Sequence, residues 1–142
     1  MNAVNQILNL KGHMVFTIGP DASVYDAIAM MADKHIGALP VMEGDNLIGL
    51  ISERDYARKG ILKGRSSPDT KVREIMSDRV MVISPERTTE ECMALMTDKR
   101  IRHLPVVEDG ELVGVISIGD LVKAIISEQR FMIEQLEHYI SS

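Results

Sequence analysis

The sequence predicts an α/β (α+β) protein in which one β-α-β-β-α unit occurs twice and a long helix follows the second copy. Shifting the chain by 65 residues places residues 17–58 on residues 82–123 without a gap, and 16 of these 42 positions are identical. Within each copy the apolar pattern alternates between strand and helix periods. One copy of roughly 60 residues is too small to bury its own sheet. We therefore expect the copies to pack sheet against sheet with pseudo-two-fold symmetry.

Local patterns predict the elements of each copy in order. The β-rich runs "MVFTI" (14–18) and "VMVI" (80–83), each closely followed by proline, predict a first strand. Ser23-x-x-Asp26 and Thr88-x-x-Glu91 are typical of the capping box that opens a helix. "ALPVM" and "HLPVV" predict the next strand, and "EGDN" and "EDGE" predict hairpin turns. "LIGLIS" and "LVGVIS" are nearly all apolar, which indicates a strand buried on both faces.

The polar segment "GRSSPD" (64–69) predicts a boundary between copies, with the first in residues 1–66 and the second in residues 67–142. Together they are expected to form one module. A weaker echo with an offset of 68 precedes each copy, where Val4, Ile7 and Leu8 resemble Val72, Ile75 and Met76.

The last helix is predicted to run to about Ile140 because no Gly or Pro follows Gly119. An apolar stripe lies along it, comprising Ile125, Met132, Leu136 and Tyr139 with Ile126, Ile133 and Ile140 alongside. The stripe either folds back on the module's own core or forms a subunit interface. We expect the second, and hence a homodimer.

Composition excludes several classes of protein. A net charge of −5 argues against non-specific nucleic-acid binding. The single cysteine, Cys92, is expected to be a buried thiol, and the four histidines lack metal-ligand spacing. No signal peptide or membrane-length apolar run is present, so we expect a cytoplasmic protein that does not engage membranes. No catalytic motif is found, so we expect that the protein is not an enzyme.

The stretches "ALPVMEGDNLIGLISERD" and "HLPVVEDGELVGVISIGD", with the preceding helices "DAIAMMADKHIG" and "ECMALMTDKRIR", carry a family resemblance. They resemble a tandem cystathionine-β-synthase (CBS) domain pair, or Bateman module, across about residues 1–126. "SERDYARK", "RIRHLPV" and "EQLEHYI" resemble a small stand-alone subgroup from bacteria and plant organelles. The resemblance implies that the chain binds AMP, ADP or ATP, or an NAD-type or S-adenosyl ligand, and that it senses rather than catalyses.

Both copies end their last strand in Ser-x-x-Asp, at Ser52 with Asp55 and at Ser117 with Asp120. The pattern is explained by a helix cap, which contributes about 1 kcal/mol. A helix N-terminus also favours phosphate, and a carboxylate there can accept hydrogen bonds from two ribose hydroxyls. The resemblance implies this second use, with each Asp on ribose and each Ser near ribose or phosphate.

Two further groups of residues enter the predicted site. Arg102 and His103, with Arg100 nearby, precede "LPV" in the second copy, whereas the first copy has Arg54, Arg58 and Lys59 after its last strand. These basic residues bind phosphate or form a solvated patch, and either copy's set could serve either cleft. By the resemblance, the adenine slots comprise Thr17, Ile18, Ala22 and Pro40 in one copy and Val82, Ile83, Arg87 and Pro105 in the other. Taken singly, the apolar members are better explained by core packing, and the alternative for Thr17 and Arg87 is an ordinary exposed side chain.

These observations favour a homodimeric adenine-nucleotide sensor. Its ligand would change its conformation and so modulate a partner protein, which the sequence leaves unknown. The alternative is a ligand-free structural module that works by dimerisation or docking. A small nucleotide-processing enzyme is disfavoured because no base, nucleophile or metal cluster is found.

Overall fold

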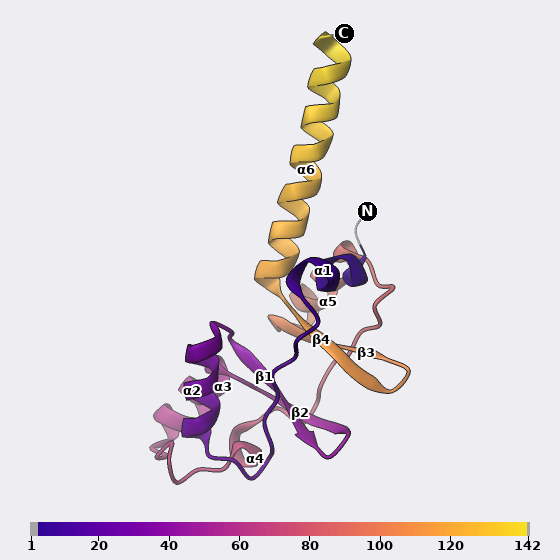
Figure 1. The fold of residues 1–142 in the computed structure, drawn as a ribbon. Coiled ribbons are helices and arrows are strands. Elements are labelled where there is room, and N and C mark those ends of the chain that lie inside the picture. The colour runs from indigo at the N-terminus through magenta and orange to yellow at the C-terminus, as the bar shows by residue number, and fades with distance from the viewer. Residues whose placement is uncertain (1–2, 142) are drawn as a thin grey trace. The chain divides into compact units, whose positions relative to one another are not determined.

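The structure is a computed structural model that describes residues 3–141, and its chain divides into two compact units. One unit is Val15–Met81, and the other combines the chain up to Met14 with the chain from Val82 onward. Each unit carries one two-stranded antiparallel sheet with helices beside it (Figure 1). The mixed fold class and the long last helix are therefore confirmed.

The elements of the two units correspond closely. The first unit contains α2 (Val24–Lys34), β1 (Ala38–Glu43), β2 (Asn46–Ser52), α3 (Glu53–Asp55), the π-helix η1 (Tyr56–Gly60), the 3-10 helix η2 (Ile61–Lys63) and α4 (Val72–Ile75). The other unit contains α1 (Val4–Lys11), α5 (Thr89–Lys99), β3 (His103–Glu108), β4 (Glu111–Ser117) and α6 (Ile118–Ser141).

The predicted caps and hairpins are present. Ser23 Oγ accepts a hydrogen bond from the Asp26 N–H at 3.0 Å, and Thr88 Oγ1 accepts one from the Glu91 N–H at 3.1 Å. Each hairpin turns through two residues, and in the second turn both Asp109 and Gly110 have positive φ, as a tight hairpin requires. Both ladders carry a bulge at the same place, between Val41 and Met42 and between Val106 and Val107.

The predicted first strand of each copy is wrong as a strand, because it contracts to one parallel bridge. Ile18 donates its N–H to the Pro40 carbonyl at 3.1 Å and accepts from the Met42 N–H at 2.9 Å. The next bonds in either direction would need an N–H from Pro40 or from Pro20, and proline has none. Ile83 stands in the same position relative to Pro105 and Pro85, with a bond of 3.0 Å to the Pro105 carbonyl.

The short helices at the start of the two copies, α1 and α4, are exchanged between the units. The Val4 N–H of α1 donates to the Arg87 carbonyl at 2.8 Å, inside the unit of the second copy. The Val72 N–H of α4 donates to the Ala22 carbonyl at 2.9 Å, inside the unit of the first copy. Because Val4 echoes Val72 and Ala22 aligns with Arg87, each helix makes the same contact, but on the other copy.

Each unit has its own apolar core, into which the exchanged helix packs. Leu8 of α1 is buried with Leu104, Val106 and Ile116, whereas Val72 and Ile75 of α4 are buried with the first copy's residues. The approach is close enough to require glycine in the last strand. A Cβ on Gly114 would lie 2.5 Å from Leu8 Cδ2, and one on Gly49 would lie 2.5 Å from Met76 Sδ.

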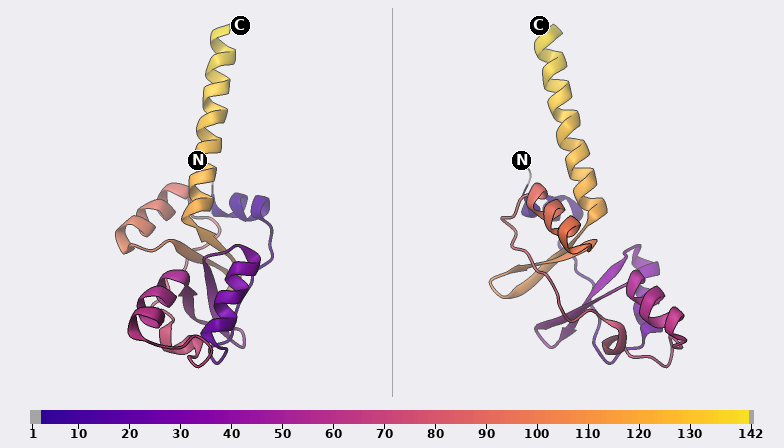
Figure 2. Two further views of the ribbon diagram at one scale, coloured as in Figure 1. Left: turned by 90° about the vertical axis from the view of Figure 1, so that its left-hand side faces the viewer. Right: turned by 180° about the vertical axis from the view of Figure 1, so that it is seen from behind.

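The long helix α6 runs unbroken to Ser141 and projects beyond the rest of its own unit (Figure 2). Leu121 is fully buried, but every residue from 129 to 141 is exposed. Within its own unit, the alternative in which the apolar stripe folds back on the core is therefore wrong for this segment.

Candidate functional site

In both copies the Ser-x-x-Asp motif joins the last strand to the following helix through a reciprocal pair of bonds. The Ser117 N–H donates to Asp120 Oδ2 at 2.8 Å, and the Asp120 N–H donates to Ser117 Oγ at 3.1 Å. The corresponding bonds between Ser52 and Asp55 are 2.9 and 3.1 Å. The motif is thus a capping box in each copy. Each Asp side chain keeps 18% of its surface exposed, so it can also meet a ligand.

A lysine distinguishes the two carboxylates. Lys11, at the end of α1, donates from Nζ to Asp120 Oδ2 at 2.7 Å and to the Val115 carbonyl at 2.8 Å. In the first copy Lys59 lies 3.7 Å from Asp55 Oδ1, one helical turn along the chain. Asp120 is therefore held by a cation from a distant segment, whereas the Asp55 pair is local.

Asp120 and His103 share one electrostatic environment. Burial raises the pKa of Asp120, but the Lys11 hydrogen bond and the Ser117 N–H outweigh it, and the net pKa lies below its ordinary value. Burial lowers the pKa of His103, and the positive charge of Lys11 lowers it further. His103 pairs directly with Ser117 in the β3–β4 ladder, which brings its ring to the same end of the hairpin. A neutral imidazole thus lies near an ionised carboxylate.

The predicted adenine-slot residues are partly brought together within each unit. Ile83 and Pro105 are joined by a backbone hydrogen bond, as are Ile18 and Pro40, and all four are buried. Of the remaining members, Val82 is exposed while Thr17 and Ala22 are half-buried.

The basic residues of the prediction are exposed near the motifs. The Arg102 carbonyl accepts from the Ile118 N–H at 2.9 Å, which places Arg102 beside the start of α6. Arg54 lies in the first turn after Ser52. Arg87 is instead paired with Glu91 of α5 at 2.6 Å.

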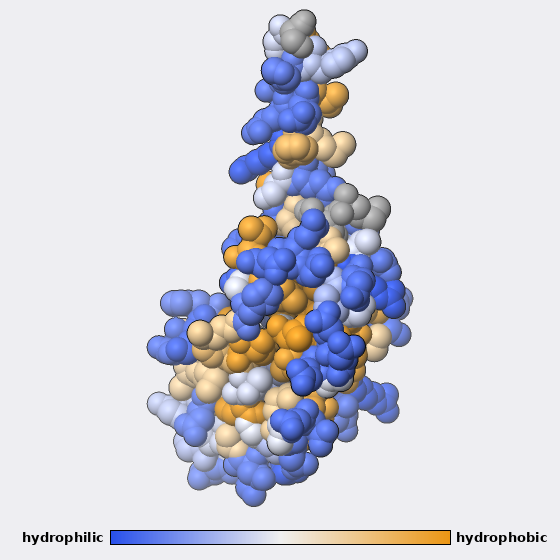
Figure 3. All heavy atoms as spheres, turned by 45° about the vertical axis from the view of Figure 1, so that its right-hand side comes forward, coloured by the Kyte–Doolittle hydropathy of each residue, from blue (hydrophilic) through white to orange (hydrophobic). Residues whose placement is uncertain are grey.

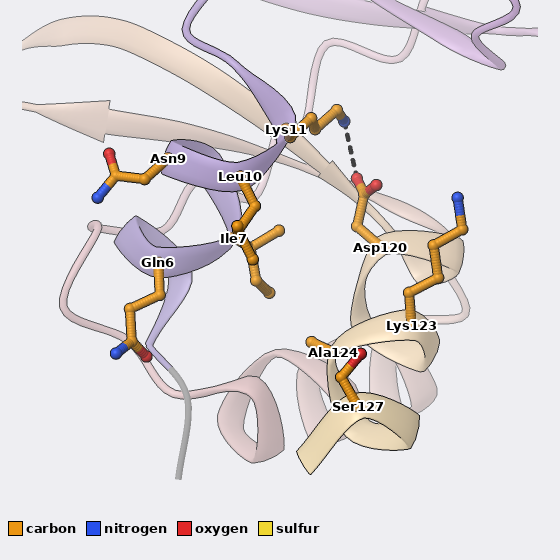
Figure 4. Close-up of a pocket in the computed structure, with 9 residues that line it drawn as sticks. All are labelled: Gln6, Ile7, Asn9, Leu10, Lys11, Asp120, Lys123, Ala124 and Ser127. Atoms are coloured by element: carbon orange, nitrogen blue, oxygen red, sulfur yellow. Dashed lines mark hydrogen bonds and ion pairs between the residues drawn. The ribbon is translucent and has the colours of Figure 1, made fainter. Parts of the chain in front are cut away.

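An open pocket of about 660 Å³ lies between α1 and α6, and Asp120 borders it (Figure 4). The Lys11 ammonium reaches from the end of α1 to Asp120, and Lys123 follows on the next turn of α6. The other lining residues are Gln6, Ile7, Asn9, Leu10, Ala124 and Ser127. The predicted slot residues Val82, Ile83, Arg87 and Pro105 are not among them.

Lys11 is the residue of this site that sequence reasoning missed. It lies near the start of the first copy, and only the exchange of α1 brings it to the second copy's carboxylate. A weak signal was present, because the echo that pairs Val4 with Val72 also pairs Lys11 with Arg79, a second basic residue.

Metal ligands, the lone thiol and the hydropathy of the helices are three further features of the described residues. Residues 3–141 contain no group of three or more His, Cys, Asp or Glu side chains that could hold a metal ion. Burial raises the pKa of Cys92 to about 11, so the thiol stays protonated near neutral pH. No helix within the same residues combines the length and apolar character that crossing a membrane requires.

Comparison with known proteins gives a family and several relatives. The CBS domain family model matches twice, at residues 12–60 and 72–127. The mitochondrial CBS domain-containing protein CBSX3 of Arabidopsis thaliana is 45% identical over 84% of the chain, and the match spans 61% of that protein. CBS domain-containing protein YhcV of Bacillus subtilis is 35% identical over 75% of the chain and 76% of its own length. Inosine-5'-monophosphate dehydrogenase of Korarchaeum cryptofilum matches over only 21% of its length.

Solved structures agree with this assignment. A protein with CBS domains from Burkholderia ambifaria is 51% identical, with a TM-score of 0.87 over 90% of this chain and 96% of that one. The CBS domain protein NE2398 is 48% identical, with a TM-score of 0.85 over 89% of this chain and 99% of that one. A CBS-CP12 protein from bloom-forming cyanobacteria, 29% identical with a TM-score of 0.77, is described as hexameric.

Proposed function

Because the chain belongs to the CBS domain family as a pair of CBS domains, a class that is generally regulatory and often binds nucleotides, we propose that it is an adenine-nucleotide sensor. AMP, ADP, ATP or an NAD-type compound is the ligand, and the protein regulates a partner rather than catalysing a reaction. The match to the dehydrogenase over about a fifth of that enzyme's length is compatible with a regulatory role.

The observation that carries the proposal is the partly exposed Asp120 carboxylate at the start of α6 (Figure 4). Its Oδ2 atom is engaged by Lys11 and by the Ser117 N–H, which leaves Oδ1 to accept hydrogen bonds from ribose hydroxyls. The α6 N-terminus favours an anion, and Arg102 adds a charge beside it. Ile83 and Pro105 stay the predicted contacts of the base, although both side chains are buried in their own unit. The first copy offers Asp55, Arg54, Ile18 and Pro40 for a second, weaker site.

Lys11 gives the second copy a preference for phosphorylated ligands. Its ammonium already lies at the carboxylate that would hold the sugar, so a phosphate on that sugar gains a nearby cation. We expect Lys11→Met to weaken AMP binding more than adenosine binding, as measured by calorimetric titration. Equal weakening of both ligands would assign Lys11 to the cap alone.

The deciding experiment is thermal melting and calorimetry with AMP, ADP, ATP and NAD, with GTP as the control. A ligand at about 100 times its dissociation constant stabilises a folded protein by roughly 2.7 kcal/mol. Asp120→Ala should abolish binding at the second copy's site, and Asp55→Ala is its matched control at the other copy. Mass spectrometry of the purified protein would identify any ligand that is retained.

A structural module with empty clefts is the second candidate, and the Lys11–Asp120 contact favours it. A carboxylate that is already satisfied at 2.7 Å has a stabilising role without any ligand. If Asp120→Ala preserves function in the cell and no adenine compound shifts the melting curve, this candidate replaces the sensor. The cytoplasmic location stays a prediction.

A further inference from the structure

An apolar seam with an alternating spacing of four and three residues runs along the exposed side of α6. We call it the α6 seam, and it comprises Val122, Ile126, Gln129, Ile133, Leu136 and Ile140. Exposure rises along it, from 43% at Val122 and Ile126 to 81% at Ile140. Figure 3 shows apolar atoms on one side of the projecting helix and hydrophilic atoms on the other.

The spacing of this seam is that of a two-helix coiled coil. Ile126, Ile133 and Ile140 take the a positions, while Val122, Gln129 and Leu136 take the d positions. Residues 129–141 of this helix are exposed, and an isolated helical segment is marginally stable in water, so this segment gains most from a second helix. Gln129 is the single polar member, and polar residues in such seams fix register.

Antiparallel pairing with a second α6 matches every layer of the seam. Val122 meets Ile140 of the partner subunit, Ile126 meets Leu136 of the partner subunit, and Gln129 meets Ile133 of the partner subunit. The two-fold axis generates three equivalent layers on its other side. All six seam residues of each helix therefore have a partner in the other helix.

Charge on one flank of the seam favours the antiparallel direction. One flank carries Lys123, Arg130 and Glu137. In the antiparallel register Lys123 faces Glu137 of the partner subunit. By symmetry this ion pair occurs twice in the dimer. Arg130 faces its own counterpart at the axis, and this is the one unfavourable contact.

The other flank carries Ile125, Met132 and Tyr139, which meet one another across the antiparallel pair. A parallel pair would instead set this apolar flank against the charged flank of its neighbour. Burying apolar side chains against each other is the more favourable arrangement.

We propose that α6 is a homodimer seam in which two molecules of this chain pair their α6 helices antiparallel. The α6 seam is covered by a second molecule of this chain, because the charges on its flank pair with the same charges of that molecule after a two-fold rotation.

Charge reversal on the full chain tests the pairing by analytical ultracentrifugation over a dilution series. Lys123→Glu and Glu137→Lys should each raise the dimer dissociation constant about tenfold, since two attractive pairs become repulsive. The double variant restores both pairs and should return close to the wild-type value. Arg130→Gln should tighten the dimer, because it removes the like-charge contact.

Glu134→Lys is the matched control, since it makes the same charge change on the outer face of the helix and should leave the dissociation constant unchanged. A monomeric wild-type protein would overturn the proposal. So would single reversals without effect, or a double variant weaker than either single one.

Disulfide trapping in a Cys92→Ala background tests separately whether the two α6 helices pair antiparallel or parallel. Met132→Cys should cross-link in the antiparallel pair because residue 132 meets its own counterpart near the axis. Leu136→Cys should cross-link only in a parallel pair, since its antiparallel neighbour is Ile126. Cross-linking at position 136 without cross-linking at 132 would overturn the proposed geometry.

Discussion

The two copies share their sheets, caps and core glycines, but they diverge after the same Ser-x-x-Asp motif. In the first copy α3 lasts three residues and passes into η1 and η2, which end at Lys63. In the second, α6 continues for 24 residues. The difference follows from Gly60 and Gly64, because Gly64 adopts a left-handed φ of 70° and Gly60 lies against the Tyr56 ring. The repeated part thus builds the sheet and the helix start, and the divergent part decides what each copy can contact.

The exchanged helices show the same division between a shared contact and a different extension. Both begin with an equivalent hydrogen bond, but α4 ends after four residues and α1 continues for eight. Of these two helices, the longer one carries a lysine to the opposing carboxylate, so Asp120 pairs with the distant Lys11 whereas Asp55 pairs with the local Lys59. Sequence identity between repeats therefore does not imply equivalent sites.

The largest expected effect comes from breaking the α1 contact. Leu8→Ala removes a side chain that is 3% exposed and should cost about 2–4 kcal/mol of unfolding free energy. Hydrogen exchange should accelerate in α5, β3 and β4 rather than in β1 and β2, because α1 packs on the second copy. Leu10→Ala on the same helix is the control, since Leu10 is 91% exposed and should cost under about 0.5 kcal/mol. Faster exchange confined to β1 and β2 would contradict the exchange of helices.

The two glycines that face the exchanged helices should come next. Gly114→Ala and Gly49→Ala each place a Cβ 2.5 Å from a neighbouring side-chain atom and should cost about 1–3 kcal/mol. Gly49→Ala should cost more, because the Ser77 carbonyl, a backbone atom, also lies 3.0 Å away. Gly119→Ala is a control of opposite sign, since its Cβ would meet only Ser117 Oγ at 3.6 Å and alanine favours a helix. Urea denaturation ranks the three variants, and equal stability of all three would refute the close approach.

A smaller effect is expected on the pH dependence of folding stability, and it arises at His103, where the first copy has Ala38. Burial lowers the pKa of His103, so the folded state disfavours its charged form. Its contribution to stability is fully present above the ordinary pKa of about 6.5 and is lost as pH falls from there toward the lowered value. Melting temperatures between pH 8 and 5 should therefore fall more steeply for the wild type than for His103→Ala. Parallel curves would show that the pKa of His103 is the same in the folded and unfolded states, which contradicts the lowered value.

The smallest effect on unfolding free energy is expected from removing Lys11 or Lys59, the lysines that pair with the two carboxylates. Lys11→Met should cost less than about 1 kcal/mol, because the pair is partly exposed, and Lys59→Met should cost still less at its longer distance of 3.7 Å. The clearer readout is carboxyl NMR, in which the pKa of Asp120 should rise once the Lys11 hydrogen bond is gone. Because that pKa is depressed in the wild type, its contribution to stability is lost as pH falls through the folded value. An unchanged Asp120 titration would contradict the contact.

Much of the fold and part of the candidate site could be predicted from sequence. The caps at Ser23 and Thr88, the hairpins and the run of α6 were predictable because each depends on neighbours within about four residues. The site residues Ser117 and Asp120 were predictable as a pair for the same reason. Lys11 was not, because 109 residues separate it from the carboxylate that it contacts. The proposed ribose role of Asp120 stays a prediction.

The repeat, the capped helices and the apolar stripe of the last helix were predictable from the sequence alone, since periodicity and caps are local properties of the chain. Tertiary structure decided which unit each short helix joins, which carboxylate receives a lysine and how far the first strand extends. The first strand illustrates the reason. "VMVI" has strand character, yet Pro85 and Pro105 remove the donors on both sides of Ile83, and only the pairing of the segments reveals that loss.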